Sequence, residues 1–111
     1  MRKTILLPIA CLMLAACGAK TISVDVAVDH GFKKQSQQFY QMVGAVDGWS
    51  GTWSGEVVEL YQFENASAIQ SDAFKSMVVP GNISGWVELC THKNMLMLSK
   101  GSDACRKLKS I

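Results

Sequence analysis

The chain has 111 residues, of which 49% are hydrophobic, and a formal net charge of +2 from 11 basic and 9 acidic residues. Two of the basic residues are Arg2 and Lys3, so the rest of the chain carries 9 basic against 9 acidic residues. This length is enough for one small domain, and the balanced charge excludes the basic surface of a nucleic-acid-binding protein.

The first sixteen residues have the layout of a secretory signal peptide. A positive start, Met1-Arg2-Lys3, precedes an apolar run from Ile5 to Ala16 that ends in small residues. The run has about twelve residues, which is too short for the roughly 20 that a membrane-spanning helix needs. We therefore expect residues 1–16 to be cleaved.

The end of this run, Leu14-Ala15-Ala16-Cys17, resembles the lipobox of bacterial lipoproteins, in which a cysteine follows an aliphatic residue and two small ones. The resemblance implies that Cys17 is lipidated, becomes the first residue of the mature protein and holds it at a membrane. Gly18, rather than Asp, follows the cysteine, which implies the inner leaflet of the outer membrane, facing the periplasm, if the host is Gram-negative. The alternative is an ordinary secretory signal with an unmodified cysteine near its end.

The chain has four cysteines. If Cys11 leaves with the signal peptide and Cys17 carries lipid, Cys90 and Cys105 are the pair that remains. In an oxidising compartment this pair predicts one disulfide. A closed loop of about 15 residues is worth roughly 3 kcal/mol in the chain-entropy model.

The predicted elements follow a tether of residues 17–20. Apolar and polar residues alternate over residues 21–29, which predicts a half-buried strand. Apolar residues at helical spacing then predict an amphipathic helix over residues 32–46. Next comes a hairpin that turns at Ser54-Gly55, and its predicted pairs are Trp53 with Glu56 and Trp49 with Leu60.

The second half of the chain is predicted to contain another helix and another hairpin. Helical spacing predicts a helix over residues 65–78, with Asn65 as its N-cap and Pro80-Gly81 as its end. The second hairpin pairs residues 84–90 with residues 94–100 through a loop at Thr91-His92-Lys93. A short helix over residues 103–111, which Ser102 can cap, would bring Cys105 back to Cys90.

This order of elements predicts an α+β fold with a small antiparallel sheet and helices on one face. The first six elements have the β-α-β-β-α-β order of the ferredoxin-like fold, with an added C-terminal strand and short helix. We expect one globular domain over residues 21–111. Two stretches, residues 32–63 and 66–100, look like repeats of a helix followed by a hairpin.

Four aromatic residues are candidates for a binding surface: Trp49, Trp53, Trp86 and Tyr61. Aromatic rings with a polar atom are enriched at such surfaces. Trp49 and Trp86 take equivalent places in the two repeats, which also fits core residues. Trp53 stands beside the hairpin turn and is expected to be the most exposed of the tryptophans.

The sequence offers no catalytic set. His30 and His92 are the only histidines, and neither a GxSxG motif nor a phosphate-binding loop is present. We therefore expect no enzyme activity and no cofactor. His92, Met95 and Met97 could form a soft-metal site for copper(I), although methionines in a strand are usually packing residues.

Taken together, these features predict a membrane-anchored envelope lipoprotein that acts as a binding or structural module for a protein or envelope partner. The alternative is a periplasmic carrier of a ligand or of copper that uses an open sheet face.

Overall fold

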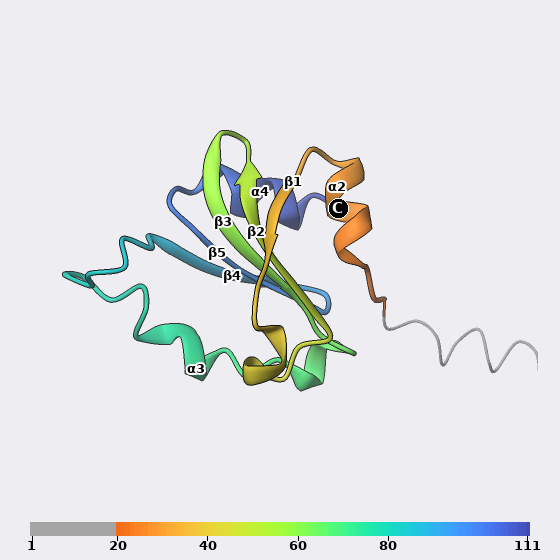
Figure 1. The fold of residues 1–111 in the computed structure, drawn as a ribbon, viewed down its shortest axis with the longest axis horizontal. Coiled ribbons are helices and arrows are strands. Elements are labelled where there is room, and N and C mark those ends of the chain that lie inside the picture. The colour runs from red at the N-terminus through yellow and green to blue at the C-terminus, as the bar shows by residue number, and fades with distance from the viewer. Residues whose placement is uncertain (1–19) are drawn as a thin grey trace, which may run out of the picture.

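A computed structural model describes residues 20–111 and contains a five-stranded sheet in the order β1-β2-β3-β5-β4 (Figure 1). All neighbouring strands are antiparallel. The strands are β1 (Lys33–Gln37), β2 (Asp47–Trp53), β3 (Glu56–Gln62), β4 (Glu88–His92) and β5 (Met95–Ser99). The helices are α2 (Val24–Asp29), α3 (Asp72–Lys75) and α4 (Asp103–Lys109), with 3-10 turns η2 (Tyr40–Val43) and η3 (Ala66–Ala68). The predicted signal peptide and Cys17 lie outside the described residues.

Each face of the sheet carries its own apolar cluster. α2 and α4 cover one face, where they pack against β3 and against Met95 and Met97 of β5. η2, η3 and α3 cover the other face, around Leu96 and Leu98. β5 is therefore buried along its whole length, which explains its continuous apolar sequence. The prediction that the helices share one face holds for α2 and α4 but not for α3, whose Phe74 lies in the second cluster.

The predicted hairpin of β2 and β3 is confirmed in its register. Trp53 pairs with Glu56, and Trp49 pairs with Leu60. Ser54 and Gly55 form the turn, and both have positive φ angles, 53° and 76°. Positive φ at both central residues is the geometry that a two-residue hairpin loop requires, and glycine adopts it without strain.

The second hairpin is also confirmed, with a shorter loop than predicted. β4 ends at His92, which pairs with Met95, so Lys93 and Asn94 alone form the loop. Lys93 adopts the left-handed conformation, with φ of 56°. With this two-residue loop, Glu88 of the edge strand β4 pairs with Ser99 of β5.

The prediction of a strand over residues 21–29 is wrong, because residues 24–29 form α2. Val24 and Ala27, three positions apart, are buried, whereas Val28 is exposed. The Gln62 side chain accepts a hydrogen bond from the main-chain nitrogen of Val24 at 3.0 Å and so satisfies a free donor of the first turn. Six residues are too few for the apolar pattern to distinguish a helix from a strand.

The prediction of a helix over residues 32–46 is also wrong. The segment forms β1, which pairs with β2, and then the 3-10 turn η2, which ends at Gly44 with φ of 79°. All five residues of β1 are exposed, so this edge strand has no apolar alternation that sequence patterns could detect. Main-chain hydrogen bonds to β2 hold it in place.

The predicted helix over residues 65–78 is reduced to η3 and the single turn α3. Asn65 does cap the first of these, since its Oδ1 accepts a hydrogen bond from Ala68 N at 3.0 Å. α4 forms as predicted, but Ser102 makes no side-chain cap. Glu56 of β3 takes that role, because its carboxylate accepts hydrogen bonds from the nitrogens of Asp103 and Ala104 at 3.0 and 2.9 Å.

The α+β class is confirmed, whereas the ferredoxin-like order is not. The described chain runs helix, three strands, short helix, two strands and helix. In the predicted repeats, residues 32–63 and 66–100, the hairpins correspond but the first helix is missing. Trp49 and Trp86 also pack against different clusters, on opposite faces of the sheet.

Candidate functional site

The four candidate aromatic residues do not form one surface. Trp53 is only 1% exposed, so the prediction that it is the most exposed tryptophan is wrong. Its ring packs against Phe32, with centroids 5.8 Å apart, and its Nε1 donates a hydrogen bond to His30 O at 3.0 Å. The chain between α2 and β1 covers the end of β2, which explains why a residue beside the turn is buried.

Tyr61 is also buried, on the other face of β3. Its ring lies 5.5 Å from that of Phe74, and its hydroxyl donates a hydrogen bond to Glu59 Oε1 at 2.9 Å. Burial raises the pKa of the Tyr61 hydroxyl above its ordinary value, and the hydrogen bond and negative charge of Glu59 raise this pKa further. Tyr61 therefore contributes to packing rather than to a binding surface.

Trp49 and Trp86 are half-buried, and each has a lysine over its ring. Lys34 Nζ lies 4.4 Å from the ring centroid of Trp49, and Lys100 Nζ lies 4.9 Å from that of Trp86. Such contacts are worth about 0.5–1 kcal/mol at exposed sites. The two rings stabilise opposite faces of the sheet and leave no shared aromatic surface.

The structure brings His92 and Met95 together as cross-strand partners, but it does not present them as an open metal site. The side chains of Met95 and Met97 are completely buried in the core beneath α4. His92 Nε2 lies 3.0 Å from the main-chain oxygen of Ile111, to which Lys93 Nζ also donates a hydrogen bond at 3.0 Å. Within residues 20–111, no three His, Cys, Asp or Glu side chains gather as a metal site would require.

Cys90 and Cys105 form the predicted disulfide, which joins β4 to α4. Both residues are buried in the cluster beneath α4. The bond therefore fixes the last helix to an edge strand of the sheet. The helices and 3-10 turns cover both faces of the sheet around β3 and β5.

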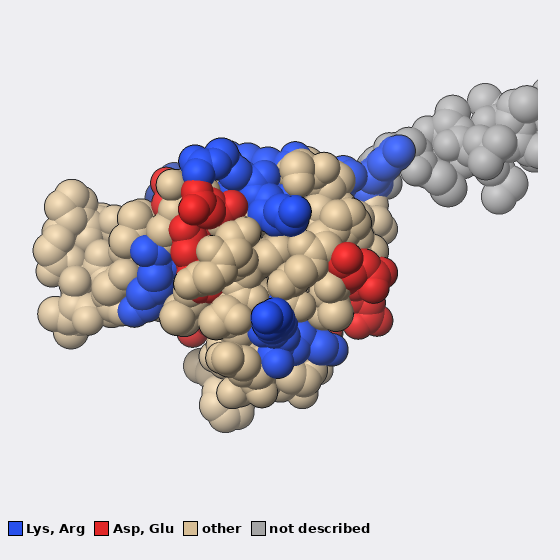
Figure 2. Space-filling model, turned by 90° about the horizontal axis from the view of Figure 1, so that it is seen from above, with Lys and Arg blue, Asp and Glu red and all other residues tan. Residues whose placement is uncertain are grey.

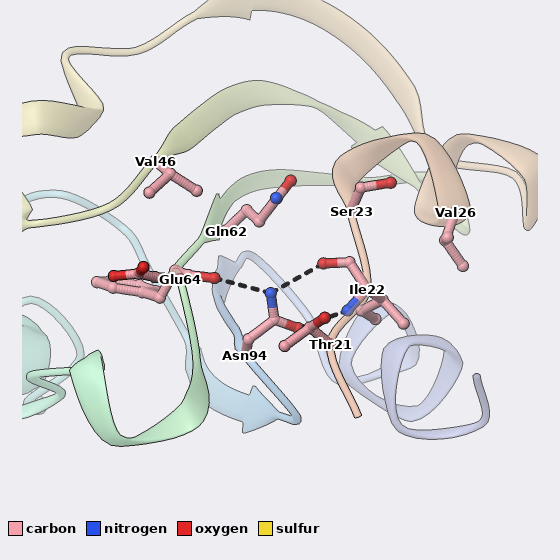
Figure 3. Close-up of a pocket in the computed structure, with 9 residues that line it drawn as sticks. Thr21, Ile22, Ser23, Val26, Val46, Gln62, Glu64 and Asn94 are labelled. Atoms are coloured by element: carbon pink, nitrogen blue, oxygen red, sulfur yellow. Dashed lines mark hydrogen bonds between the residues drawn. The ribbon is translucent and has the colours of Figure 1, made fainter. Parts of the chain in front are cut away.

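A hollow of about 680 Å³ opens where the described chain begins, at the end of the sheet away from the β2–β3 turn (Figure 3). Its walls are the residues before and within α2, the ends of β2 and β3, and Asn94. The lining residues are Thr21, Ile22, Ser23, Val26, Val46, Gln62, Phe63, Glu64 and Asn94. Its side-chain polar groups are hydroxyls, amides and one carboxylate.

Asn94 is the central polar residue of this hollow, and its side chain is 1% exposed. Its Nδ2 donates hydrogen bonds to Ile22 O at 2.9 Å and to Phe63 O at 2.8 Å, while its Oδ1 accepts one from Ile22 N at 2.7 Å (Figure 3). The side chain thereby ties Ile22 to the end of the sheet. This role was not predicted from the sequence, because an asparagine at a hairpin loop normally indicates only a turn.

Two groups of apolar side chains remain exposed. One surrounds η2 and consists of Phe39, Met42 and Val46, the last of which lines the hollow. The other belongs to residues 76–87, which contain no charged residue and include the exposed Val79, Ile83 and Val87. Figure 2 shows this segment as an uncharged lobe that projects beyond the charged side chains around it.

None of the helices between residues 20 and 111 is long and apolar enough to cross a membrane. No protein-family model, curated protein or solved structure matches the chain.

Proposed function

We propose that the chain is a membrane-anchored lipoprotein of the cell envelope whose domain acts as a binding or structural module for a protein or envelope partner. The observation that carries this proposal is the position at which the domain begins. Asn94 holds Ile22 against the sheet, only five positions after the cysteine of the lipobox-like sequence. Five residues span at most about 18 Å, so a lipid on Cys17 would keep the domain at the membrane surface.

The disulfide supports export from the cytoplasm. Bonds such as Cys90–Cys105 form and persist in oxidising compartments and are rare in the cytosol. The sequence pattern before Cys17 is that of an exported lipoprotein, and Gly18 supports the inner leaflet of the outer membrane in a Gram-negative host. The sequence pattern and the disulfide are independent features that agree on the same compartment.

The uncharged lobe of residues 76–87 is the best candidate for the surface that contacts a protein partner. Ile83 is fully exposed in this lobe, and Val79 and Val87 are exposed as well. Asn82 shapes the lobe, since its side chain bonds the main chain of Val79, Gly85 and Trp86. Apolar groups that a protein keeps exposed on an ordered segment are typical of interaction sites.

Metabolic labelling of whole cells with an alkyne analogue of palmitate tests the anchor. The full chain should be labelled and should fractionate with membranes, and Cys17→Ala should lose both properties. Cys90→Ser is the matched control, because it removes a cysteine that carries no lipid and should keep the label. A Cys17→Ala protein that is still labelled would refute the proposal.

The partner surface is tested with a photocrosslinking amino acid at Ile83 in living cells. The same crosslinker at Val57, which is exposed on the β2–β3 hairpin, is the control. We expect one reproducible protein adduct from position 83 that position 57 does not give. The same adducts from both positions, or none from position 83, would exclude the lobe as the contact surface.

A further inference from the structure

The apolar side chains around η2 are unusually exposed. Phe39 is 82% exposed and Met42 is 84% exposed, and the main chain links them, because Met42 N donates a hydrogen bond to Phe39 O. No charged residue occurs between Lys34 and Asp47. Large apolar side chains held on an uncharged turn favour contact with an apolar phase.

The η2 turn lies at the same end of the domain as the start of the described chain. Val46, which follows the turn, lines the hollow together with Ile22 and Ser23 (Figure 3). Its main-chain nitrogen donates a hydrogen bond to Gln62 O at 2.7 Å. In Figure 1 the yellow η2 turn and the start of the described chain, before α2, both lie on the lower side, away from the β2–β3 turn. The exposed apolar side chains therefore lie at the end of the domain to which an anchor on Cys17 would be joined.

We propose that Phe39, Met42 and Val46 insert into the surface of the bilayer that carries the anchor. This inference rests on the proposed function, because it needs a lipid on Cys17. The segment from Cys17 to Ile22 spans at most about 18 Å, and apolar faces of interfacial elements enter a bilayer by about 5–10 Å. The tether is short enough to bring the η2 turn to that depth, whereas the β2–β3 turn lies a strand of seven residues further away, or about 23 Å.

The surroundings of the turn indicate which lipids it contacts. The glutamines adjacent to Phe39 and Met42 in the sequence are the half-buried Gln38 and the exposed Gln41, and both are uncharged. Amide groups hydrogen-bond to lipid head groups of any charge, so they give no preference for anionic lipids. The contact is thus expected to be the same with zwitterionic and anionic bilayers and to be insensitive to salt, unlike that of a basic membrane-binding segment.

Site-specific photocrosslinking of the full-length protein tests the inference. A photoreactive phenylalanine analogue replaces Phe39, Met42 or, as the matched control, Val57, which is 48% exposed at the far end of the sheet. All three positions are exposed, so each variant should fold, and formation of the Cys90–Cys105 disulfide on a non-reducing gel confirms that it does. The purified lipidated proteins are placed in phosphatidylcholine vesicles, with or without phosphatidylglycerol.

We expect lipid adducts from positions 39 and 42 at a yield several-fold above that from position 57, and equal yields in the two kinds of vesicle. Equal adducts from all three positions, or none from positions 39 and 42, would overturn the inference while leaving the anchor intact. Adducts that require phosphatidylglycerol would overturn it as well, because the contact would then be electrostatic. Mass spectrometry of Cys17 separates these outcomes from failure of the proposed function, in which no lipid is present.

Discussion

Replacing Asn94 by alanine tests whether the start of the domain is held as the structure indicates. The Asn94 side chain makes three hydrogen bonds, two to Ile22 and one to Phe63 O. A typical hydrogen bond contributes about 1 kcal/mol net, and a buried acceptor left without a donor costs about 1–3 kcal/mol. Water can replace the partly exposed bonds to Ile22, but it reaches the buried bond to Phe63 O poorly.

We therefore expect Asn94→Ala to lower the free energy of unfolding by about 2–4 kcal/mol. For a domain of this size, that corresponds to a fall in Tm of roughly 10–25 °C. Urea unfolding and thermal unfolding, both followed by circular dichroism, measure the change. Hydrogen exchange should also show that the Ile22 amide loses its protection. The protection of the amides in the middle of β3 should fall only as much as the free energy of unfolding of the whole domain falls.

Asn82→Ala is the matched control. The Asn82 side chain makes four hydrogen bonds, one more than the Asn94 side chain. A smaller loss of stability in Asn82→Ala therefore cannot come from a smaller number of bonds. Most of these bonds are exposed, and water can replace them, so the loss should stay below about 1 kcal/mol. If Asn82→Ala cost as much as Asn94→Ala, or if Asn94→Ala cost less than about 1 kcal/mol, the role assigned to Asn94 would be refuted.

Two further predictions concern the core. Cys90→Ser and Cys105→Ser should each lower the free energy of unfolding by about 3 kcal/mol, and the double variant should be no worse than either in urea unfolding; additive losses would contradict the bond between them. The raised pKa of Tyr61 means that the folded protein keeps this hydroxyl protonated where an unfolded tyrosine, with a pKa of about 10, ionises. The stability that Tyr61 contributes is thus present below about pH 10 and falls as the pH rises beyond it. Between about pH 9 and 12, the free energy of unfolding of Tyr61→Phe should therefore depend less on pH than that of the unsubstituted protein. Equal pH dependence in the two proteins would refute the assignment.

The hairpins could be predicted from the sequence because local signals determine them. Ser54-Gly55 supplies the left-handed conformation that a two-residue loop needs. The pairing of Trp49 with Leu60 then follows from counting outward from the turn. The disulfide was also predictable, since Cys90 and Cys105 were the pair left once Cys11 was assigned to the predicted signal peptide and Cys17 to the predicted lipid.

The first part of the domain could not be predicted, because non-local contacts determine it. α2 alternates in polarity as a strand would, and only burial of Val24 and Ala27 against the sheet makes it a helix. β1 is entirely exposed and is held by main-chain bonds to β2, so its side chains give no signal. The role of Asn94 was hidden as well, because its partner Ile22 lies 72 positions away.

The contacts of Ile22 and Val24 with distant residues also determine how an anchor on Cys17 would hold the domain. A lipid on a long flexible tether fixes only the distance from the membrane, and the domain can then turn freely. Here Asn94 fixes Ile22, and Gln62 fixes Val24, so only about four residues of the chain would separate an anchor on Cys17 from the fixed part of the domain. Such a short link would restrict rotation and would present one end of the sheet to the lipid. That end carries the exposed Phe39 and Met42, while the uncharged lobe of residues 76–87 projects sideways (Figure 1), where it remains accessible to a partner at the membrane surface.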